Sequence, residues 1–286
     1  MSLLVATVAF SCPGDGFIRH YGKNKLSIPI SLQSHVDEQK FDELIEKVNQ
    51  YYAPLVRAEG AELVFKKYWE SSTVNARAKR DGNKWTVSMY GGLARHPEVT
   101  EDAFLLVLCH EMGHHLGGFP KYDYVGLNWA ASEGQSDYWG AHKCMQRVLE
   151  LEKNKEYVEQ NISVPEPVAF KCFQNFISKE EQSICVRTAV AGFSLARLFA
   201  SLQNSLNDSY PSVSSTDPTQ IESSFSFHPP PQCRFDTYMQ GALCLKSIQE
   251  TVHNDVEDEK AGLCTEEFYN NGLRPRCWYR SEEQSL

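Results

Sequence analysis

The sequence predicts an α+β fold in which a small mixed or antiparallel sheet packs against buried helices. Residues 61–69 and 85–90 alternate apolar and polar side chains as strands do, and Asp81-Gly82 between them is a turn signal. Residues 100–118 are an apolar segment of helical length that starts with a capping residue and ends in glycines. Nine cysteines, most of them in the C-terminal half, predict that disulfides staple a C-terminal elaboration onto this core.

Length and composition limit the size of the fold and the kinds of partner. A chain of 286 residues with 42% hydrophobic residues can bury a substantial core, in one domain with additions. A net charge of -9 argues against nucleic acid or an anionic membrane as the main partner, because both repel an acidic protein. No apolar run approaches the ~18 residues that span a bilayer, so we expect no transmembrane segment.

The chain divides into a short leader, a main domain and an extension. We expect the main domain over residues 13–250, with a polar, lid-like loop at 206–227, and a cysteine-bearing extension over 251–286. Residues 1–12 are apolar without a basic start, so they are either the remnant of a trimmed export signal or a first strand. Cys12 follows a loose lipoprotein-type cleavage site, so a lipid at the N-terminus is one route of attachment to a membrane.

Two further helices are predicted from apolar positions at helical spacing. Residues 37–55 have an apolar stripe and an acidic opposite face, and residues 180–205 repeat apolar side chains in the same way. We expect the second of these helices to act as scaffold against the sheet or against the helix at 100–118. Residues 26–32 predict a short strand ahead of the first helix.

The helix at 100–118 carries the residues with the clearest chemistry. Thr100 can cap its first turn, and the helix has almost no polar face, so it belongs in the core. His110 and His114 are four residues apart and project from one face, where both imidazoles can reach one zinc ion at roughly 2.0–2.1 Å. Glu111 lies about 100° round the helix, which suits a general base that contacts a metal-bound water.

The following segment supplies candidates for a third ligand, which a zinc held by two histidines requires while one position stays open for water. Ser132 and Gln135 resemble a capping box that opens a second helix. Glu133 and Asp137 then share one face of that helix. We expect Glu133 to be the ligand and Asp137 to accept the free N–H of a ligand histidine. The rival assignment makes Asp137 the ligand.

Two other segments are candidates for the same site. An edge strand beside a peptide cleft holds an extended peptide by backbone pairing, and the strand at 85–90 is either such an edge or an ordinary sheet strand. Its candidate substrate-binding residues are Trp85, Val87, Met89 and Tyr90. His228 precedes three prolines that hold it on a rigid segment, from which it either stabilises an oxyanion at the metal site or lies on the surface.

The cysteines predict an oxidising compartment. Six of them form three neighbouring couples that suggest local disulfide loops, Cys109 and Cys144 flank the expected metal site and could form a fourth bridge, and the alternative is that several are reduced cysteines of the core. The three couples are Cys172 with Cys185, Cys233 with Cys244, and Cys264 with Cys277. We therefore expect an exported protein, either periplasmic or secreted.

Several of these features, in order along the chain, resemble one zinc metallopeptidase family. It includes the CAAX prenyl endopeptidases, the bacterial HtpX heat-shock peptidases and the soluble periplasmic peptidases of outer-membrane assembly. The matching pieces are Val74-Asn75-Ala76, Gly91-Gly92-Leu93, His110-Glu111-Met112-Gly113-His114, Glu133-x-x-x-Asp137, and His228-Pro229 with Arg234. The set covers roughly residues 40–245 and is more specific than the zinc motif alone.

The resemblance implies a zincin-like (gluzincin) core with His110, His114 and Glu133 as zinc ligands and Glu111 as the base. It also implies that His228 is a transition-state or latency residue near the zinc, with Arg234 as its structural or site-facing partner. The expected function is a zinc-dependent endopeptidase that acts on proteins or peptides. The alternative is a non-catalytic binding or chaperone-like protein that keeps zinc only to hold its fold.

Overall fold

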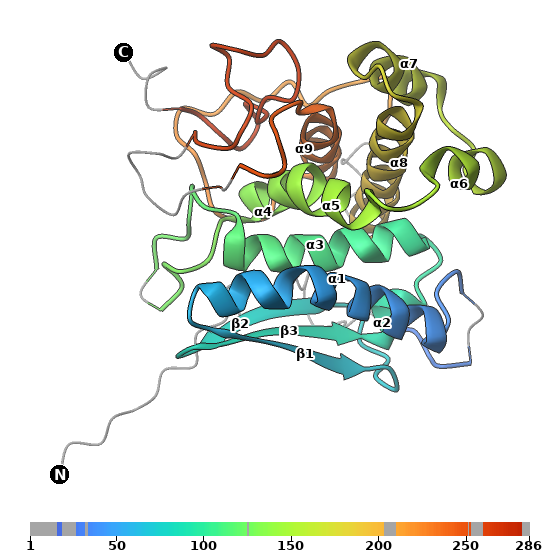
Figure 1. Ribbon diagram of the computed structural model, residues 1–286, viewed down its shortest axis with the longest axis vertical. Helices are drawn as coiled ribbons and strands as arrows, with labels where there is room; N and C mark the ends of the chain where they lie inside the picture. Colours follow the sequence, from blue (N-terminus) through green and yellow to red (C-terminus); the bar gives the residue numbers. More distant parts are fainter. Residues whose placement is uncertain are drawn as a thin grey trace.

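The computed structural model describes residues 16–18, 27–31, 34–124, 126–202, 210–250, 252 and 260–281. Figure 1 shows a small sheet at one end of the molecule, with helices stacked above one of its faces. The elements in chain order are α1 (Glu38–Ala58), β1 (Glu62–Tyr68), β2 (Ala76–Asp81), β3 (Lys84–Tyr90), α2 (Gly91–Ala94), α3 (Glu101–Leu116), α4 (Glu133–Trp139), η1 (Gly140–Cys144), α5 (Met145–Leu149), α6 (Asn154–Asn161), α7 (Glu166–Asn175), α8 (Lys179–Leu202) and α9 (Pro231–Leu243). The prediction of an α+β fold with a small mixed sheet is confirmed.

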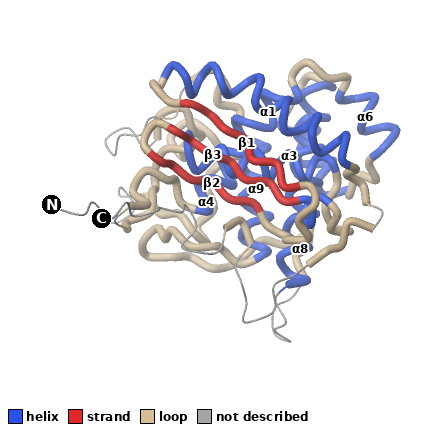
Figure 2. The backbone as a smooth tube through the Cα atoms, turned by 90° about the horizontal axis from the view of Figure 1, so that it is seen from below, coloured by secondary structure: helices blue, strands red, loops and turns tan. Residues whose placement is uncertain are grey.

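The sheet has three strands in the order β1-β3-β2 (Figure 2). β1 runs parallel to β3, and β2 pairs with β3 in the antiparallel sense from Ala76 opposite Met89 to Asp81 opposite Lys84. Gly82 lies in the hairpin turn with φ +58°, a conformation that side-chain-bearing residues rarely adopt, as the turn signal predicted. β3 therefore uses its backbone on both sides, and β2 is the edge strand next to α3.

This strand order decides between the two alternatives for residues 85–90: they form an ordinary central strand, and the alternative of a substrate-binding edge is wrong. Trp85, Val87 and Met89 are buried in the core, and Tyr90 is half-buried against Tyr68. A central strand has no unpaired backbone to offer an extended peptide, and the edges of this sheet are β1 and β2. Alternation of apolar residues predicts a strand but says nothing about its neighbours, which is why the sequence did not distinguish these positions.

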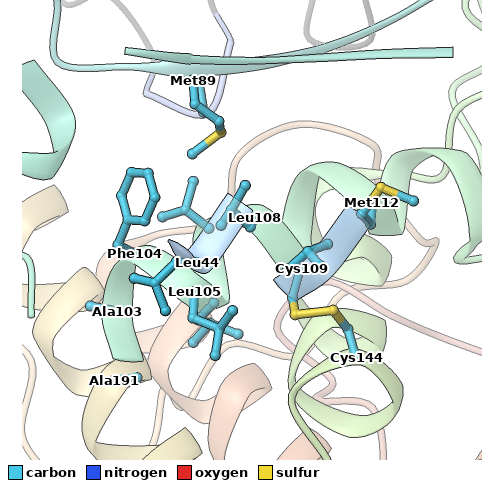
Figure 3. Close-up of a cluster of buried hydrophobic side chains, with 14 of the residues drawn as sticks. Leu44, Met89, Ala103, Phe104, Leu105, Leu108, Cys109, Met112, Cys144 and Ala191 are labelled. Atoms are coloured by element: carbon cyan, nitrogen blue, oxygen red, sulfur yellow. A yellow bond between two sulfur atoms is a disulfide. The ribbon is translucent and has the colours of Figure 1, made fainter. Parts of the chain in front are cut away.

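Helix α3 lies at the centre of the molecule, with the sheet and α1 on one side and α4, α5 and α8 on the other (Figure 1). Thr100 caps it as predicted, because its side chain accepts a hydrogen bond from the Ala103 N–H. In Figure 3, Phe104 and Leu108 lie between Met89 of β3 and Leu44 of α1. Burial of each such large apolar side chain contributes roughly 1.5–3 kcal/mol. This packing fixes the face of α3 that carries the histidines.

Helix α8 bears on the expectation that no apolar segment of the chain is long enough to span a membrane. Among the described residues it is the one helix long and apolar enough to cross a membrane by length and composition, and 67% of its most apolar window is buried. It packs between α3 and α9, and its Arg187 forms a buried ion pair with Asp102 at the start of α3. A core helix of a soluble protein passes the same test of length and composition, so α8 is weak evidence for a membrane span.

Four disulfides are present in the described part of the chain, and two of the four predicted pairings are correct. Cys109 bonds to Cys144 and Cys172 to Cys185, as expected. The couples Cys233 with Cys244 and Cys264 with Cys277 are wrong. The observed bonds are Cys233–Cys277 and Cys244–Cys264. The fold places these partners within Cα distances of 6.0 and 5.7 Å, and spatial proximity rather than sequence proximity decides the pairing.

The C-terminal segment is fastened to α9 by the disulfides Cys233–Cys277 and Cys244–Cys264, and Trp278 packs directly against Gly134 of α4. The described loop 210–230 runs beside this segment and is tied to it by backbone hydrogen bonds, such as that from the Phe225 N–H to the Trp278 carbonyl. The predicted strand at 26–32 is reduced, within its described residues 27–31, to an isolated bridge between Ser27 and Thr73. The predictions for residues 1–12, Cys12 and the start of the lid-like loop lie outside the described residues.

Candidate metal centre

Two helices bring two imidazoles and a carboxylate to one buried point. His110 and His114 project from α3, and Glu133 projects from the first turn of α4. The His110 Nε2 atom lies 3.3 Å from Oε2 of Glu133, and the His114 Nε2 atom lies 3.6 Å from Oε1. Ligand atoms bound at roughly 2.1 Å in tetrahedral geometry are about 3.4 Å apart. The two separations, measured to different oxygens of Glu133, are each close to the spacing between ligand atoms of one metal ion.

The close approach of α3 and α4 depends on a glycine. A Cβ atom on Gly113 would lie 2.8 Å from both Cα and O of Ser136, so a larger residue would force the helices apart. Ser132 begins α4 by accepting a hydrogen bond from the Gln135 N–H. The reciprocal bond of a capping box is not formed, because the Ser132 N–H donates to the Pro120 carbonyl at 2.8 Å. Gln135 Nε2 donates to the Gly117 carbonyl at 2.6 Å and ties α4 to the end of α3.

Both histidines present Nε2 to the shared point because their Nδ1 atoms have other partners. His110 Nδ1 lies 2.7 Å from Oδ1 of Asp137, and His114 Nδ1 lies 2.8 Å from the Ala131 carbonyl. An Nδ1–H that donates to an oxygen leaves the Nε2 lone pair available for a metal. Within the described residues, Nε2 of His110 is fully buried and faces Oε2 of Glu133 at 3.3 Å without a hydrogen bond of good geometry. A buried ring nitrogen of this kind fits a metal ligand, since an unsatisfied polar atom is otherwise costly.

Asp137 is the hub of a buried network behind His110. Its carboxylate accepts two hydrogen bonds at 2.7 Å from the Nε and Nη2 atoms of Arg234, and one at 2.6 Å from the Tyr238 hydroxyl. Burial raises the pKa of Asp137, but the Arg234 guanidinium and then His110 outweigh burial and lower it. Asp137 is thus an anion whose position is fixed on one side by an arginine and on the other by a histidine.

The second carboxylate, that of Glu111, lies on α3 beside the two histidines. His110, Glu111 and His114 form a buried group whose ligand atoms lie within 4.8 Å of one another and could hold a metal ion. Burial raises the pKa of Glu111 to about 8, against the opposing effect of the neighbouring His110. A carboxyl with a raised pKa next to a metal site can accept and release a proton near neutral pH.

The electrostatics of the centre favour a cation. Burial lowers the pKa of His110, but Asp137 and then Glu133 outweigh burial and raise it to about 9. Burial lowers the pKa of His114 to about 4, so its imidazole is neutral at pH 7. Burial raises the pKa of Glu133, but His228 and the other histidines hold it well below its usual value. A bound metal cation would replace the proton on His110.

His228 reaches the centre from the segment before α9. Its Nε2 atom lies 3.4 Å from Oε2 of Glu133 and 3.1 Å from the carbonyl oxygen of Gly16. A nitrogen that donates to a carbonyl holds a proton and cannot at the same time ligate a metal. In this structure His228 is therefore a hydrogen-bond donor beside the two ligand histidines.

The structure thus brings together His110, Glu111, His114, Glu133, Asp137, His228 and Arg234. It leaves Trp85, Val87 and Met89 in the core and Tyr90 half-buried. Sequence reasoning missed Tyr122 and Tyr238, whose hydroxyls donate to Glu133 and Asp137. It also missed Gly16, because the segment 13–34 has no periodic pattern. The signal that was available is the glycine itself, at φ +80°.

The chain has no match among known family models, curated proteins or solved structures. The resemblance carried by the histidine motif and its companions therefore stays a prediction. The function assigned below depends on the geometry of this site.

Proposed function

We propose that the protein is a zinc-dependent endopeptidase in which His110, His114 and Glu133 hold the metal. The observation that carries the proposal is the set of ligand atoms at 3.3 and 3.6 Å separations around one buried point, with a second buried carboxylate, Glu111, beside them. Two neutral imidazoles and one carboxylate are a donor set typical of catalytic zinc, which keeps a fourth position for water or substrate.

Zinc held by these three residues would lower the pKa of a water molecule and polarise the carbonyl of a peptide bond. Glu111 accepts the proton of the attacking water and then delivers it to the leaving amine, a role for which its carboxylate lies beside both histidines. His228 donates a hydrogen bond to the substrate carbonyl oxygen, where negative charge develops. Asp137, held by Arg234, keeps His110 in the tautomer that presents Nε2.

The same proposal places the enzyme outside the cytosol. Four disulfides within the described residues are consistent with an oxidising, exported compartment. We infer a periplasmic or secreted protein that acts on protein or peptide substrates. The acidic net charge agrees with a role unrelated to nucleic acid.

A non-catalytic, zinc-stabilised binding protein is the second candidate. The observation that favours it is the complete burial of His110, Glu111, His114 and Glu133, each of which has an exposed fraction of 0%. A structural zinc site is closed to solvent, whereas a catalytic site must admit a substrate. The two candidates differ in whether any form of the protein cleaves a peptide bond.

The test compares the parent protein with Glu111→Gln and with Glu101→Gln, a partly exposed glutamate on the same helix. We expect Glu111→Gln to retain bound zinc, measured by mass spectrometry, while proteolysis of a denatured protein falls by about 10²–10⁴-fold. Glu101→Gln should leave both the amount of bound zinc and the rate of proteolysis unchanged. Full zinc-dependent proteolysis by Glu111→Gln would remove Glu111 as the base. Stoichiometric zinc in proteins that never cleave, including the activated variant described below, would favour the binding protein.

A further inference from the structure

The described residues closest to the N-terminus, Gly16–Ile18, lie on the candidate metal centre. The Gly16 carbonyl accepts the hydrogen bond from His228 Nε2 at 3.1 Å. The Phe17 N–H donates to the Ala76 carbonyl of β2 at 3.0 Å. The Asn75 side chain accepts from the Ile18 N–H at 3.0 Å and donates to the Ile18 carbonyl at 3.3 Å. Three successive residues are thus bound at the end of the edge strand.

These contacts are made to main-chain atoms of the segment and do not depend on its side chains. Arg234 completes them by donating from Nη1 to the Phe17 carbonyl at 3.4 Å. Any extended peptide carries the same N–H and C=O groups, and pairing with an exposed strand edge is a general way to bind one. The groups that hold Gly16–Ile18 are therefore the groups that would hold a peptide substrate.

The register of the segment brings one peptide bond to the reactive position. The Gly16 carbonyl is bonded to His228, and that same His228 nitrogen lies 3.4 Å from the Glu133 carboxylate. We propose that Gly16–Ile18 is a tethered substrate mimic, with the Gly16–Phe17 peptide in the place of the bond that the enzyme cleaves. The inference rests on the endopeptidase function proposed above. It implies that the protein is latent until this segment is displaced.

The side chain of Phe17 indicates the class of substrate. Phe17 is fully buried, with its ring 4.9 Å from the His110 ring and 5.2 Å from the Phe199 ring. The Arg234 guanidinium lies 4.8 Å from the centre of the same ring. A pocket with these walls selects a large apolar or aromatic side chain. The preferred substrates therefore carry such a residue directly after the cleaved bond.

The backbone of Gly16 shows that the residue before the proposed cleaved bond is held in a position that only glycine fits. Gly16 has φ +80°, and a Cβ atom there would lie 2.6 Å from the Ala76 carbonyl oxygen and 2.7 Å from the Asn75 Oδ1 atom. A residue with a side chain can neither adopt this conformation easily nor fit this space. A tethered segment also has an effective concentration of about the mM range, so free peptide at lower concentration does not displace it.

The experiment uses Gly16→Ala to displace the segment and Gly60→Ala as the matched control. Gly60 has nearly the same backbone conformation, with φ +75°, but no atom lies within 4 Å of its added Cβ. Gly60→Ala therefore introduces the same backbone strain as Gly16→Ala but no steric clash. The probe is the peptide acetyl-Gly-Phe-Ile-amide, and its Kd is measured by calorimetry on zinc-loaded Glu111→Gln protein, which does not consume it. Phe17→Ala is a second way to release the segment, and circular dichroism confirms that each variant is folded.

We expect Gly16→Ala and Phe17→Ala to lower the Kd of the probe at least tenfold, and Gly60→Ala to leave it unchanged. With Glu111 present, Gly16→Ala should raise kcat/KM for a peptide with Phe after the cleaved bond at least tenfold, more than for the same peptide with Ala there. If the Kd of the probe is the same in the parent, in Gly16→Ala and in Phe17→Ala, the proposal that Gly16–Ile18 occupies the substrate site is wrong. If the releasing variants bind the probe more tightly but no protein that retains Glu111 cleaves a peptide, the segment does occupy a peptide site and the proposed endopeptidase function is wrong. If the parent protein already cleaves the peptide and Gly16→Ala does not raise kcat/KM, the endopeptidase function is supported and the substrate mimic is wrong.

Discussion

Asp137→Asn is the sharpest test of the network behind the ligand histidines. The Asp137 carboxylate accepts hydrogen bonds from His110, from Tyr238 and from two nitrogens of Arg234, all between 2.6 and 2.7 Å. An asparagine has the same shape but removes the charge and turns one acceptor oxygen into a donor. That new NH₂ group faces N–H or O–H donors, and Arg234 remains buried without its counter-ion.

Two magnitudes follow from this geometry. Removal of one partner from a fully buried ion pair costs about 3–5 kcal/mol, so the free energy of unfolding should fall by that amount. Loss of the group that orients a ligand histidine typically costs about 10–100-fold in metal affinity, so zinc should bind correspondingly more weakly. Urea unfolding of the metal-free protein measures the first, and titration against a competing chelator measures the second.

Asp102→Asn is the matched control, because Asp102 is also a buried helical carboxylate held by two nitrogens of one arginine. Arg187 donates to it at 2.9 and 2.6 Å, at the start of α3 and away from the histidines. The control should lose a similar free energy of unfolding but keep its zinc affinity. Unchanged zinc affinity in Asp137→Asn, or an equal loss in Asp102→Asn, would refute the assignment of Asp137 as the residue that orients His110.

Two further predictions concern stability. Burial lowers the pKa of Lys143 from 10.5 to about 8, so between these pH values the unfolded state holds a proton that the folded state has lost. The free energy of unfolding should therefore rise with pH across this range, by up to about 3 kcal/mol before solvent screening, and Lys143→Met should abolish the rise in urea unfolding. Replacing both cysteines of a disulfide by alanine should cost about 3 kcal/mol for Cys172–Cys185, with separation 13, and about 4 kcal/mol for Cys109–Cys144, with separation 35. A loss that is larger for the shorter loop would contradict the loop-entropy argument.

Local spacing determined much of the candidate site before any fold was known. The positions of His110 and His114 on one helix face follow from their separation of four residues, and Thr100 and Ser132 cap their helices as predicted. Glu133 and Asp137 share a face for the same reason. These features depend on backbone geometry within one or two helical turns, which the sequence fixes directly.

Contacts between distant segments were decided only by the tertiary structure. The strand at residues 84–90 became the centre of the sheet, and Cys233 found Cys277 instead of Cys244. Gly16 came to lie against His228, although the two are 212 residues apart. Each of these outcomes depends on packing free energy summed over the whole core, to which one segment's pattern contributes only a small part. The sequence therefore specified the directions of the ligand side chains along their helices, and the fold decided which strand, which cysteine and which stretch of chain would meet them.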